Sequence, residues 1–252
     1  MPRLAGSAAL LVAAVGTAHG AMVLPSGGTS LDNILNGPFA GSFQVEDKRF
    51  DISSFSGSSS LALDILVKPV VFANPLDGIG FDLVFSNVSV HDDDKELGND
   101  DGSPTSLTFG LDYTVTITEP GFAIKDALLA IKGSALTGGD DIVDDDDGNA
   151  FFRVTEEYAG MGLMQDLVVE DDATGMEIVD QKFFENNLQQ SLDVMKDVEL
   201  FAEGGKNYDG DDDDDGFVSV EFIRQTFSQV PAPGTTALLL AGGIAAARRR
   251  RA

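Results

Sequence analysis

The chain has 252 residues, with 42 Asp and Glu against 16 Lys and Arg, and a formal net charge of -26. A surface of that sign repels the phosphates of nucleic acids, so we expect no nucleic-acid partner. The sequence contains no cysteine, which excludes disulfides, thiolate metal sites and a cysteine nucleophile. Stability must then come from an apolar core, for which the chain is long enough.

The first twenty residues have the pattern of a secretory signal peptide. Arg3 supplies the positive start, residues 8–15 form an apolar run, and Ala18-His19-Gly20 places small residues at both positions that a signal peptidase reads. We therefore expect residues 1–20 to be removed by cleavage between Gly20 and Ala21, and the remainder to be exported.

The last 23 residues, VPAPGTTALLLAGGIAAARRRRA, have three parts. Prolines hold the first part extended, residues 234–247 are uncharged and mostly apolar, and the third part is basic. A rigid spacer, an apolar segment and a basic block predict a membrane-inserted sorting signal, residues 230–252, whose charges stay on the cytoplasmic side. The residues that carry this prediction are Val230, Pro231, Pro233, Arg248, Arg249, Arg250 and Arg251.

In order and position these parts resemble the PEP-CTERM sorting signal of exported bacterial proteins, although Ala232 stands where that signal usually has glutamate. The resemblance implies an exosortase-type processing enzyme in the membrane as a partner. An ordinary C-terminal membrane anchor is the alternative. About fourteen residues at about 1.5 Å each span about 21 Å, less than a hydrocarbon core of about 30 Å, which suits a transient transmembrane helix.

Residues 21–229 remain as one acidic domain. Without Arg3 and the four terminal arginines the formal charge falls by five units, from -26 to about -31. Such a charge suits a saline medium, where the Debye length is short, or a medium containing divalent cations. Aspartate occurs mostly in runs, which we interpret first as solvated loops.

Alternation of apolar and polar residues predicts that this domain is built from β-strands. In residues 105–119, apolar side chains occupy every second position from Leu107 to Ile117, which indicates a strand with one buried face. Further strands are expected at 42–50, 61–72, 79–90, 123–131, 151–158, 166–170, 177–183, 192–202 and 217–227. Many short strands without βαβ alternation predict an all-β fold, a single antiparallel β-sandwich that is jelly-roll-like or immunoglobulin-like.

Two short segments are exceptions that we expect to be helical: residues 29–35, which Ser30 can cap, and residues 182–188. Two other stretches, GSFQVEDKRFDISSFSG around Asp47-Lys48 and FIRQTFSQ at 222–229, resemble a recurrent, functionally uncharacterised β-rich ectodomain of PEP-CTERM proteins. That resemblance implies a fold but no activity.

Candidates for catalysis are weak, and we expect no enzyme. His91 is the only histidine left after removal of the signal peptide, and beside three aspartates it is more typical of a loop than of a catalytic base. A glycosidase needs a carboxylic acid with a raised pKa in an apolar cleft, which aspartates in loop runs do not offer. The lack of tryptophan also counts against a carbohydrate-binding module, because sugar platforms depend on aromatic faces.

The most patterned acidic run resembles half of a calcium loop. It places Asp211, Asp213 and Asp215 at loop positions 1, 3 and 5, with Gly216 at position 6. Position 12 is Phe222 instead of glutamate, and the residues after Gly216 predict a strand. We interpret the run first as a solvated loop, and alternatively as a weak Ca²⁺ site with an affinity of about 0.1–1 mM.

Together these features predict an exported, non-enzymatic protein that passes through the inner membrane and then acts at the cell surface or outside the cell. Its role would be that of a structural or interaction module whose acidic loops, bridged by Ca²⁺, contact polysaccharide or neighbouring proteins. The alternative is a secreted carbohydrate-binding domain or hydrolase on the same sandwich. A third interpretation makes the acidity only an adaptation to salt.

Replacing Arg248, Arg249, Arg250 and Arg251 with serine should disturb membrane retention or processing, because the basic block holds the tail's end on the cytoplasmic side. Fractionation of cells and medium, with both termini read by mass spectrometry, measures the effect. An unchanged distribution of the chain would count against a sorting role.

Millimolar Ca²⁺ should modestly raise the melting temperature of the exported protein relative to Na⁺ at matched ionic strength. A ligand that binds only the folded state shifts the folding equilibrium toward it. Equal melting temperatures in the two salts would remove the Ca²⁺ interpretation and leave adaptation to salt.

Overall fold

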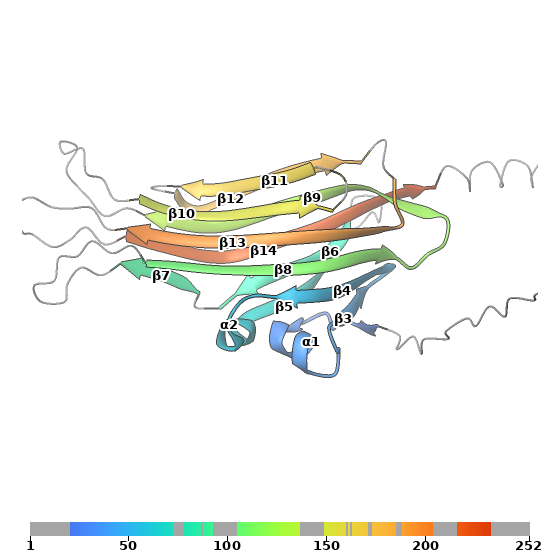
Figure 1. The fold of residues 1–252 in the computed structure, drawn as a ribbon, viewed down its shortest axis with the longest axis horizontal. Helices are drawn as coiled ribbons and strands as arrows, with labels where there is room; N and C mark the ends of the chain where they lie inside the picture. The colour runs from blue at the N-terminus through green and yellow to red at the C-terminus, as the bar shows by residue number, and fades with distance from the viewer. Residues whose placement is uncertain are drawn as a thin grey trace, which may run out of the picture.

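The computed structural model describes residues 21–72, 78–86, 88–92, 105–136, 149–159, 161, 163–170, 173–184, 188–203 and 216–232. Two β-sheets pack face to face along one long axis (Figure 1). The predicted all-β sandwich is therefore confirmed, while its jelly-roll-like or immunoglobulin-like connectivity stays a prediction.

The first sheet, called sheet A, contains seven strands in the spatial order β1-β3-β4-β8-β13-β10-β11. Every neighbouring pair is antiparallel except β1 and β3, which run parallel over two residues, so a purely antiparallel sandwich was a wrong expectation in this one respect. The strands are β1 Met22–Val23, β3 Ser42–Val45, β4 Lys48–Phe55, β8 Thr105–Ile117, β13 Ser191–Glu203, β10 Asn149–Tyr158 and β11 Leu163–Glu170.

The second sheet, called sheet B, has the order β12-β9-β14-β6-β5-β2, and β7 also pairs with β14. Its longest strand, β14, pairs with β9 along one side and with β6 and β7 along the other. The strands are β12 Ala173–Phe183, β9 Phe122–Leu136, β14 Gly216–Pro231, β6 Ile79–Phe85, β5 Ile65–Val71, β2 Thr29–Ser30 and β7 Ser89–Asp92.

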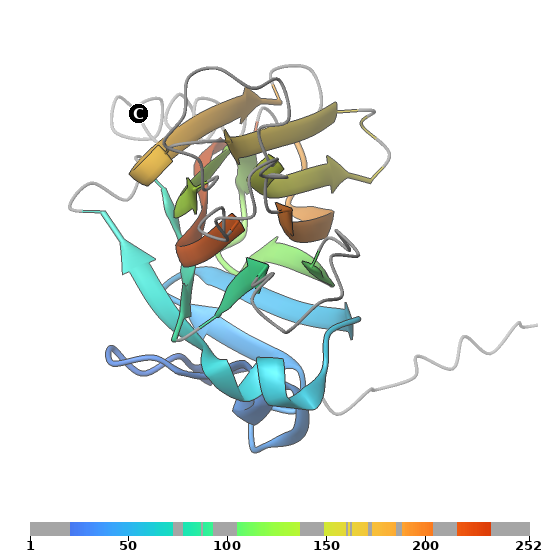
Figure 2. The ribbon, with the colours of Figure 1, turned by 90° about the vertical axis from the view of Figure 1, so that its left-hand side faces the viewer.

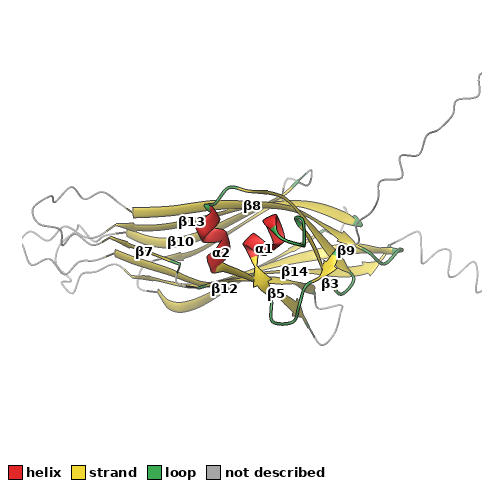
Figure 3. Ribbon diagram, turned by 90° about the horizontal axis from the view of Figure 1, so that it is seen from below, coloured by secondary structure: helices red, strands yellow, loops and turns green. Residues whose placement is uncertain are grey.

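Two short helices, α1 (Leu31–Asn36) and α2 (Ser59–Asp64), close one side of the sandwich (Figures 2 and 3). In α1 the Ser30 side chain accepts a hydrogen bond from the Asn33 backbone N–H at 3.3 Å, which confirms the predicted cap. Each helix buries its apolar face, with Leu31 at 0% and Leu61 at 6% exposure. Both helices thus continue the core where no strand covers it.

Three predicted strands differ from the observed ones. Residues 42–50 form the β3–β4 hairpin, which turns at Glu46 with a left-handed φ of 50°. Residues 79–90 divide into β6 and the start of β7. Residues 61–64 belong to α2 instead of a strand, because Ser58 caps that helix by accepting a hydrogen bond from the Leu61 N–H at 3.1 Å.

The predicted helix at 182–188 is wrong at its start. Lys182 and Phe183 end strand β12, where they pair with Ala127 and Asp126 of β9. Pairing with a long neighbouring strand outweighs a short local helical pattern, because an isolated helix of two turns is marginal in water. Residues 185–187 lie outside the described residues.

An aromatic cluster fills one half of the space between the sheets. The ring of Phe50 on β4 lies 5.0 Å from that of Phe43, 5.1 Å from that of Phe81 and 6.2 Å from that of Phe227. Tyr113 packs edge-on against Phe81 at 5.6 Å. All five rings are at most 2% exposed, so this cluster belongs to the core.

A buried polar cluster crosses the sandwich beside these rings. Lys196 on β13 and Glu156 on β10 are both 0% exposed and form an ion pair of 2.7 Å. The Glu156 carboxylate also accepts hydrogen bonds from the hydroxyls of Tyr158 at 2.6 Å and Tyr113 at 3.4 Å. Lys196 donates to the Gln225 Oε1 on β14 at 3.2 Å, which links the two sheets.

Burial sets the proton affinities in this cluster. Burial, with the nearby Glu156 carboxylate, raises the pKa of Tyr113 well above its ordinary value and raises the pKa of Tyr158 likewise. Burial lowers the pKa of Lys196, although the same carboxylate opposes that shift. Both effects follow because a low-dielectric interior disfavours a charged group.

The free energy of unfolding should fall steeply with pH above about 10.5. There the unfolded chain has ionised its tyrosines, whose ordinary pKa is about 10, while the folded chain keeps Tyr113 and Tyr158 protonated. The folded state then binds up to two more protons, a slope of about 2.7 kcal/mol per pH unit. The lowered pKa of Lys196 acts in the opposite direction, but only below about 10.5, since lysine is neutral in both states above that pH.

Urea unfolding at a series of alkaline pH values measures this slope, and tyrosinate absorbance reports ionisation directly. Two of the three tyrosines should remain protonated until the domain unfolds. Normal titration of all three near pH 10 in the folded protein would contradict the burial of this cluster.

Candidate functional site

The described residues include only some of those in the predicted sorting signal, and none of the three aspartates predicted to bind Ca²⁺. Asp211, Asp213 and Asp215 lie outside the described residues, as do Pro233 and residues 248–251. In the described ranges no three side chains of His, Cys, Asp or Glu gather as metal ligands. Likewise, none of the helices described there has the length and apolar character needed to cross a membrane. The Ca²⁺ site and the transmembrane helix therefore stay predictions.

The start of the predicted tail is part of the folded domain. Val230 pairs with Ala123, and Pro231 pairs with Phe122, so β14 continues through the first two tail residues. The Ala232 N–H then donates to the Gly121 carbonyl at 2.8 Å. The expected domain boundary after residue 229 thus falls inside a strand, because this extended segment completes the pairing of β9.

His91 lies on β7 and not in a loop. It pairs with Phe217 of β14, and the two rings are 6.3 Å apart in an edge-on arrangement. Pairing with the start of β14 therefore places His91 in the separate strand β7, Ser89–Asp92. The residue contributes to the sheet end and is not part of the hollow described below.

The outer face of sheet A carries many polar side chains, and the alternation of buried and outward residues is most regular on β10 and β13. Along β13, every second residue from Leu192 to Ala202 points into the core, and the residues between them face outward. Hydroxyls and carboxylates pair across the strands of that outer face. These pairs are Ser54–Asp112 at 2.7 Å, Thr114–Asp193 at 2.6 Å, Thr116–Ser191 at 2.9 Å and Thr155–Asp166 at 3.3 Å.

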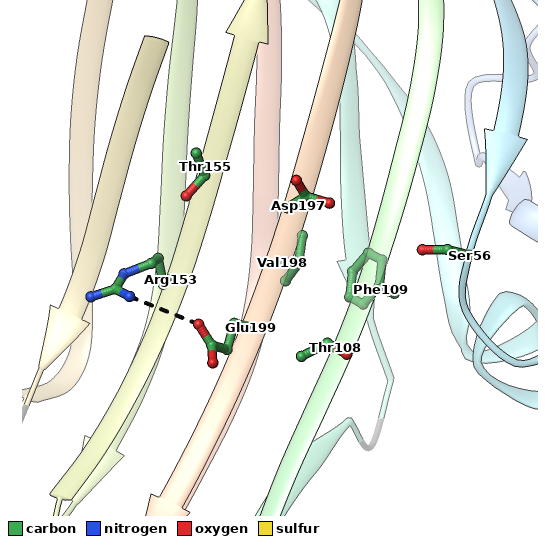
Figure 4. Close-up of a pocket in the computed structure, with 8 residues that line it drawn as sticks. All are labelled: Ser56, Thr108, Phe109, Arg153, Thr155, Asp197, Val198 and Glu199. Atoms are coloured by element: carbon green, nitrogen blue, oxygen red, sulfur yellow. Dashed lines mark ion pairs between the residues drawn. The ribbon is translucent and has the colours of Figure 1, made fainter.

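A hollow of about 520 Å³ interrupts this face (Figure 4). Gly110 of β8, which pairs with Asp197 of β13, lies next to two of its lining residues. A Cβ at Gly110 would meet the Ser56 Oγ at 2.9 Å and the Asp197 Oδ1 at 3.1 Å. A side chain at Gly110 would therefore crowd two groups that line the hollow. The lining residues are Ser56, Thr108, Phe109, Arg153, Thr155, Asp197, Val198 and Glu199.

One cation lies among the carboxylates of this hollow. Arg153 of β10 has guanidinium nitrogens 3.8 Å from Glu199 and 3.8 Å from Asp166, and the Glu199 contact is the dashed line in Figure 4. The three side chains are 40–51% exposed, so each ion pair contributes little to stability. The same groups remain accessible to a ligand as donors and acceptors.

Two aromatic rings continue the face toward the end of the sheet. Phe151 of β10 and Phe201 of β13 are directly opposite residues, and their rings stack at 5.2 Å with an interplanar angle of 14°. The Arg153 guanidinium lies 5.0 Å from the Phe151 ring centroid. On the other side of Phe201 the opposite residue is Ser106 of β8, which is exposed and small. Room for a flat ligand thus remains beside this ring.

This arrangement suits binding better than catalysis. The hollow offers exposed carboxylates, one guanidinium and several hydroxyls, with apolar rings beside them. A hydrolase would need one buried carboxylate facing a second one across a cleft. The buried carboxylate of Glu156 instead faces Lys196 inside the core, so it does not reach this hollow.

Sequence reasoning missed Arg153, Asp197, Glu199 and the Phe151–Phe201 pair. The alternation in 151–158 and 192–202 could have assigned each residue to the outer face. It could not show that β10 and β13 are neighbours, because 32 residues, which include two other strands, separate them in the chain. The pairing alone brings these side chains together.

Comparisons with known proteins assign no family. No family model matches the chain, and no curated protein matches it. Among solved structures, the chain is similar to TmCBM61, a module solved in complex with beta-1,4-galactotriose, with 12% identity, 71% of this chain and 87% of that chain covered, and a TM-score of 0.29. A likeness at that level carries no argument about ligand or mechanism, so the chain's own side chains must carry it.

Proposed function

We propose that the protein is an exported, non-catalytic module that binds polysaccharide across the outer face of sheet A. The observation that carries this proposal is the hollow lined by Asp197 and Arg153, with the ring of Phe201 nearby. Carboxylates and a guanidinium hydrogen-bond sugar hydroxyls, while an aromatic face packs against the C–H side of a sugar ring. A convex, uniformly acidic surface would offer neither a hollow nor an aromatic face to a sugar.

The ligand should be neutral. The whole chain carries a formal charge of -26, and Arg153 is the only cation among the residues that line the described hollow. A polymer of uronic acids or sulfated sugars would be repelled over the whole face. Neutral sugars avoid that repulsion, and their hydroxyls can donate to Asp197 and Glu199.

Export and anchoring belong to the same proposal. The signal peptide at residues 1–20 would carry the chain across the inner membrane, and the tail at 230–252 would hold it there until an exosortase-type enzyme processes it. A bound polysaccharide at the cell surface would then be connected, through the domain, to the membrane or to the extracellular matrix. The structural role that the sequence predicted and the binding role of this face are thus compatible.

Replacing Phe201 with alanine, together with Asp197→Asn, should weaken binding of a neutral polysaccharide at least about tenfold, equivalent to about 1.4 kcal/mol. Loss of the Phe201 ring removes one contact surface, and replacement of the Asp197 carboxylate by an amide removes an anionic acceptor. Affinity electrophoresis through gels containing neutral glucans, galactans or mannans, followed by calorimetry on the best of them, measures the change.

Phe183→Ala with Glu221→Gln provides a matched control. Phe183 is 51% exposed and the Glu221 side chain is 50% exposed, and both residues lie on sheet B. The control should bind as the original protein does, and melting temperatures should show that both double variants are folded. Equal losses in the two variants, or retention of binding only for polyuronates, would contradict the proposed site.

A further inference from the structure

Strand β14 gives the sandwich a direction. It runs over 16 residues from Gly216, which pairs with Asp92, to Pro231, which pairs with Phe122. At about 3.3 Å per residue the strand covers about 50 Å. Figure 1 shows β14 running along the sandwich, with β7 and the end of β13 toward one end and the end of β14 at the other.

The three acid-rich connections all start and finish at the Gly216 end. Leu136 pairs with Phe217, Thr105 with Ala202, and Asn149 with Glu203. These strand ends therefore meet where residues 93–104, 137–148 and 204–215 leave the sheets. Those connections contain seventeen of the 42 acidic residues and two lysines, so the end where they attach is the anionic end of the domain.

The tail starts at the opposite end, and very few residues separate the folded domain from the uncharged segment of the tail. Ala232 is still tied to Gly121 by a hydrogen bond of 2.8 Å, and the uncharged segment starts at Gly234. Two residue steps span at most about 7 Å. A membrane that holds the uncharged segment must therefore lie close to the Pro231 end of sheet B.

The surface near Pro231 has the chemistry of a membrane interface. Phe183 at the end of β12 is 51% exposed and lies beside Asp126, which pairs with Ser228 three residues before Pro231. The Lys125 side chain is 47% exposed, and its ammonium lies 5.7 Å from the Phe183 ring centroid. At a membrane surface, phenylalanine rings can be buried at the boundary between headgroups and acyl chains, and lysines with long apolar stems can keep their ammonium groups at the headgroups.

We propose that the Pro231 end, marked by Phe183 and Lys125, is a lipid-contacting surface on which the sandwich stands end-on. The proposal rests on the membrane anchoring described under the proposed function. It places the strand ends from which the acid-rich connections leave about 50 Å from the bilayer, many Debye lengths from anionic headgroups at physiological salt. A domain lying flat would instead bring those charges within reach of the same headgroups, at an electrostatic cost.

The outward face of strand β12 offers a ladder for testing the orientation. Phe183, Gln181, Val179 and Glu177 are exposed and alternate along one face of a single strand. The chain has no cysteine, so each substitution to cysteine creates one labelling site. The full-length protein, labelled singly with a fluorophore, would be inserted into phosphatidylcholine–phosphatidylglycerol vesicles carrying a headgroup nitroxide quencher.

Quenching should be strongest for Phe183→Cys and intermediate for Gln181→Cys. The Gln181→Cys variant retains the Phe183 ring. It should be about threefold or more weaker for Glu177→Cys, since six residues of strand span about 20 Å. Val179→Cys is a matched control, because Val179 at 52% exposure resembles Phe183 at 51% but lies four residues farther from the membrane.

The other outcomes would each overturn the end-on arrangement. Equal quenching along the ladder would indicate a domain lying flat, and absence of quenching at all positions in a vesicle-bound chain would indicate a domain held away from lipid. A chain that does not float with the vesicles would remove membrane anchoring as well. Polysaccharide binding is measured separately on the same labelled proteins, so its failure is distinguished from failure of the orientation.

Discussion

The pairing of β14 with β9 along one side, and with β6 and β7 along the other, is the constraint on which the rest of the molecule depends. From this strand Gln225 reaches across the core to Lys196 on β13, which holds the buried pair with Glu156. Removal of one partner of such a buried pair costs about 3–5 kcal/mol, because the other charge remains without compensation. The polar cluster thus favours one register of the two sheets over alternatives that would leave it incomplete.

That register also determines what the outside of sheet A presents. Because successive side chains of a strand point to opposite faces, Lys196 pointing inward forces Asp197 outward, and Glu156 pointing inward forces Thr155 outward. Asp197 and Thr155 are directly opposite residues on β13 and β10, and both line the hollow. The buried cluster and the proposed ligand-binding hollow are therefore the two faces of the same strand pairing, one hidden from water and the other offered to a ligand.

Different features of the surface lie at different positions along the long axis of the domain. One end carries the connections rich in aspartate, the other leads directly into the tail, and the hollow lies on a side between them. If the domain stands on its tail end, the hollow faces sideways and can hold a polymer that runs along the cell surface. An acidic outer end would at the same time keep neighbouring anionic molecules apart by repulsion, within the short range that salt allows.

The sequence by itself determined the class of fold and the capped helix at Ser30, because periodicity and capping are local properties of a chain. It was less reliable at residues 61–64 and 182–183, where a helix cap or a long neighbouring strand decided between competing local patterns. Only the tertiary structure decided which outer faces adjoin, that Lys196 and Glu156 meet in the core, and that β14 extends into the tail. Strand order depends on contacts between residues far apart in the chain, and no local pattern encodes those contacts.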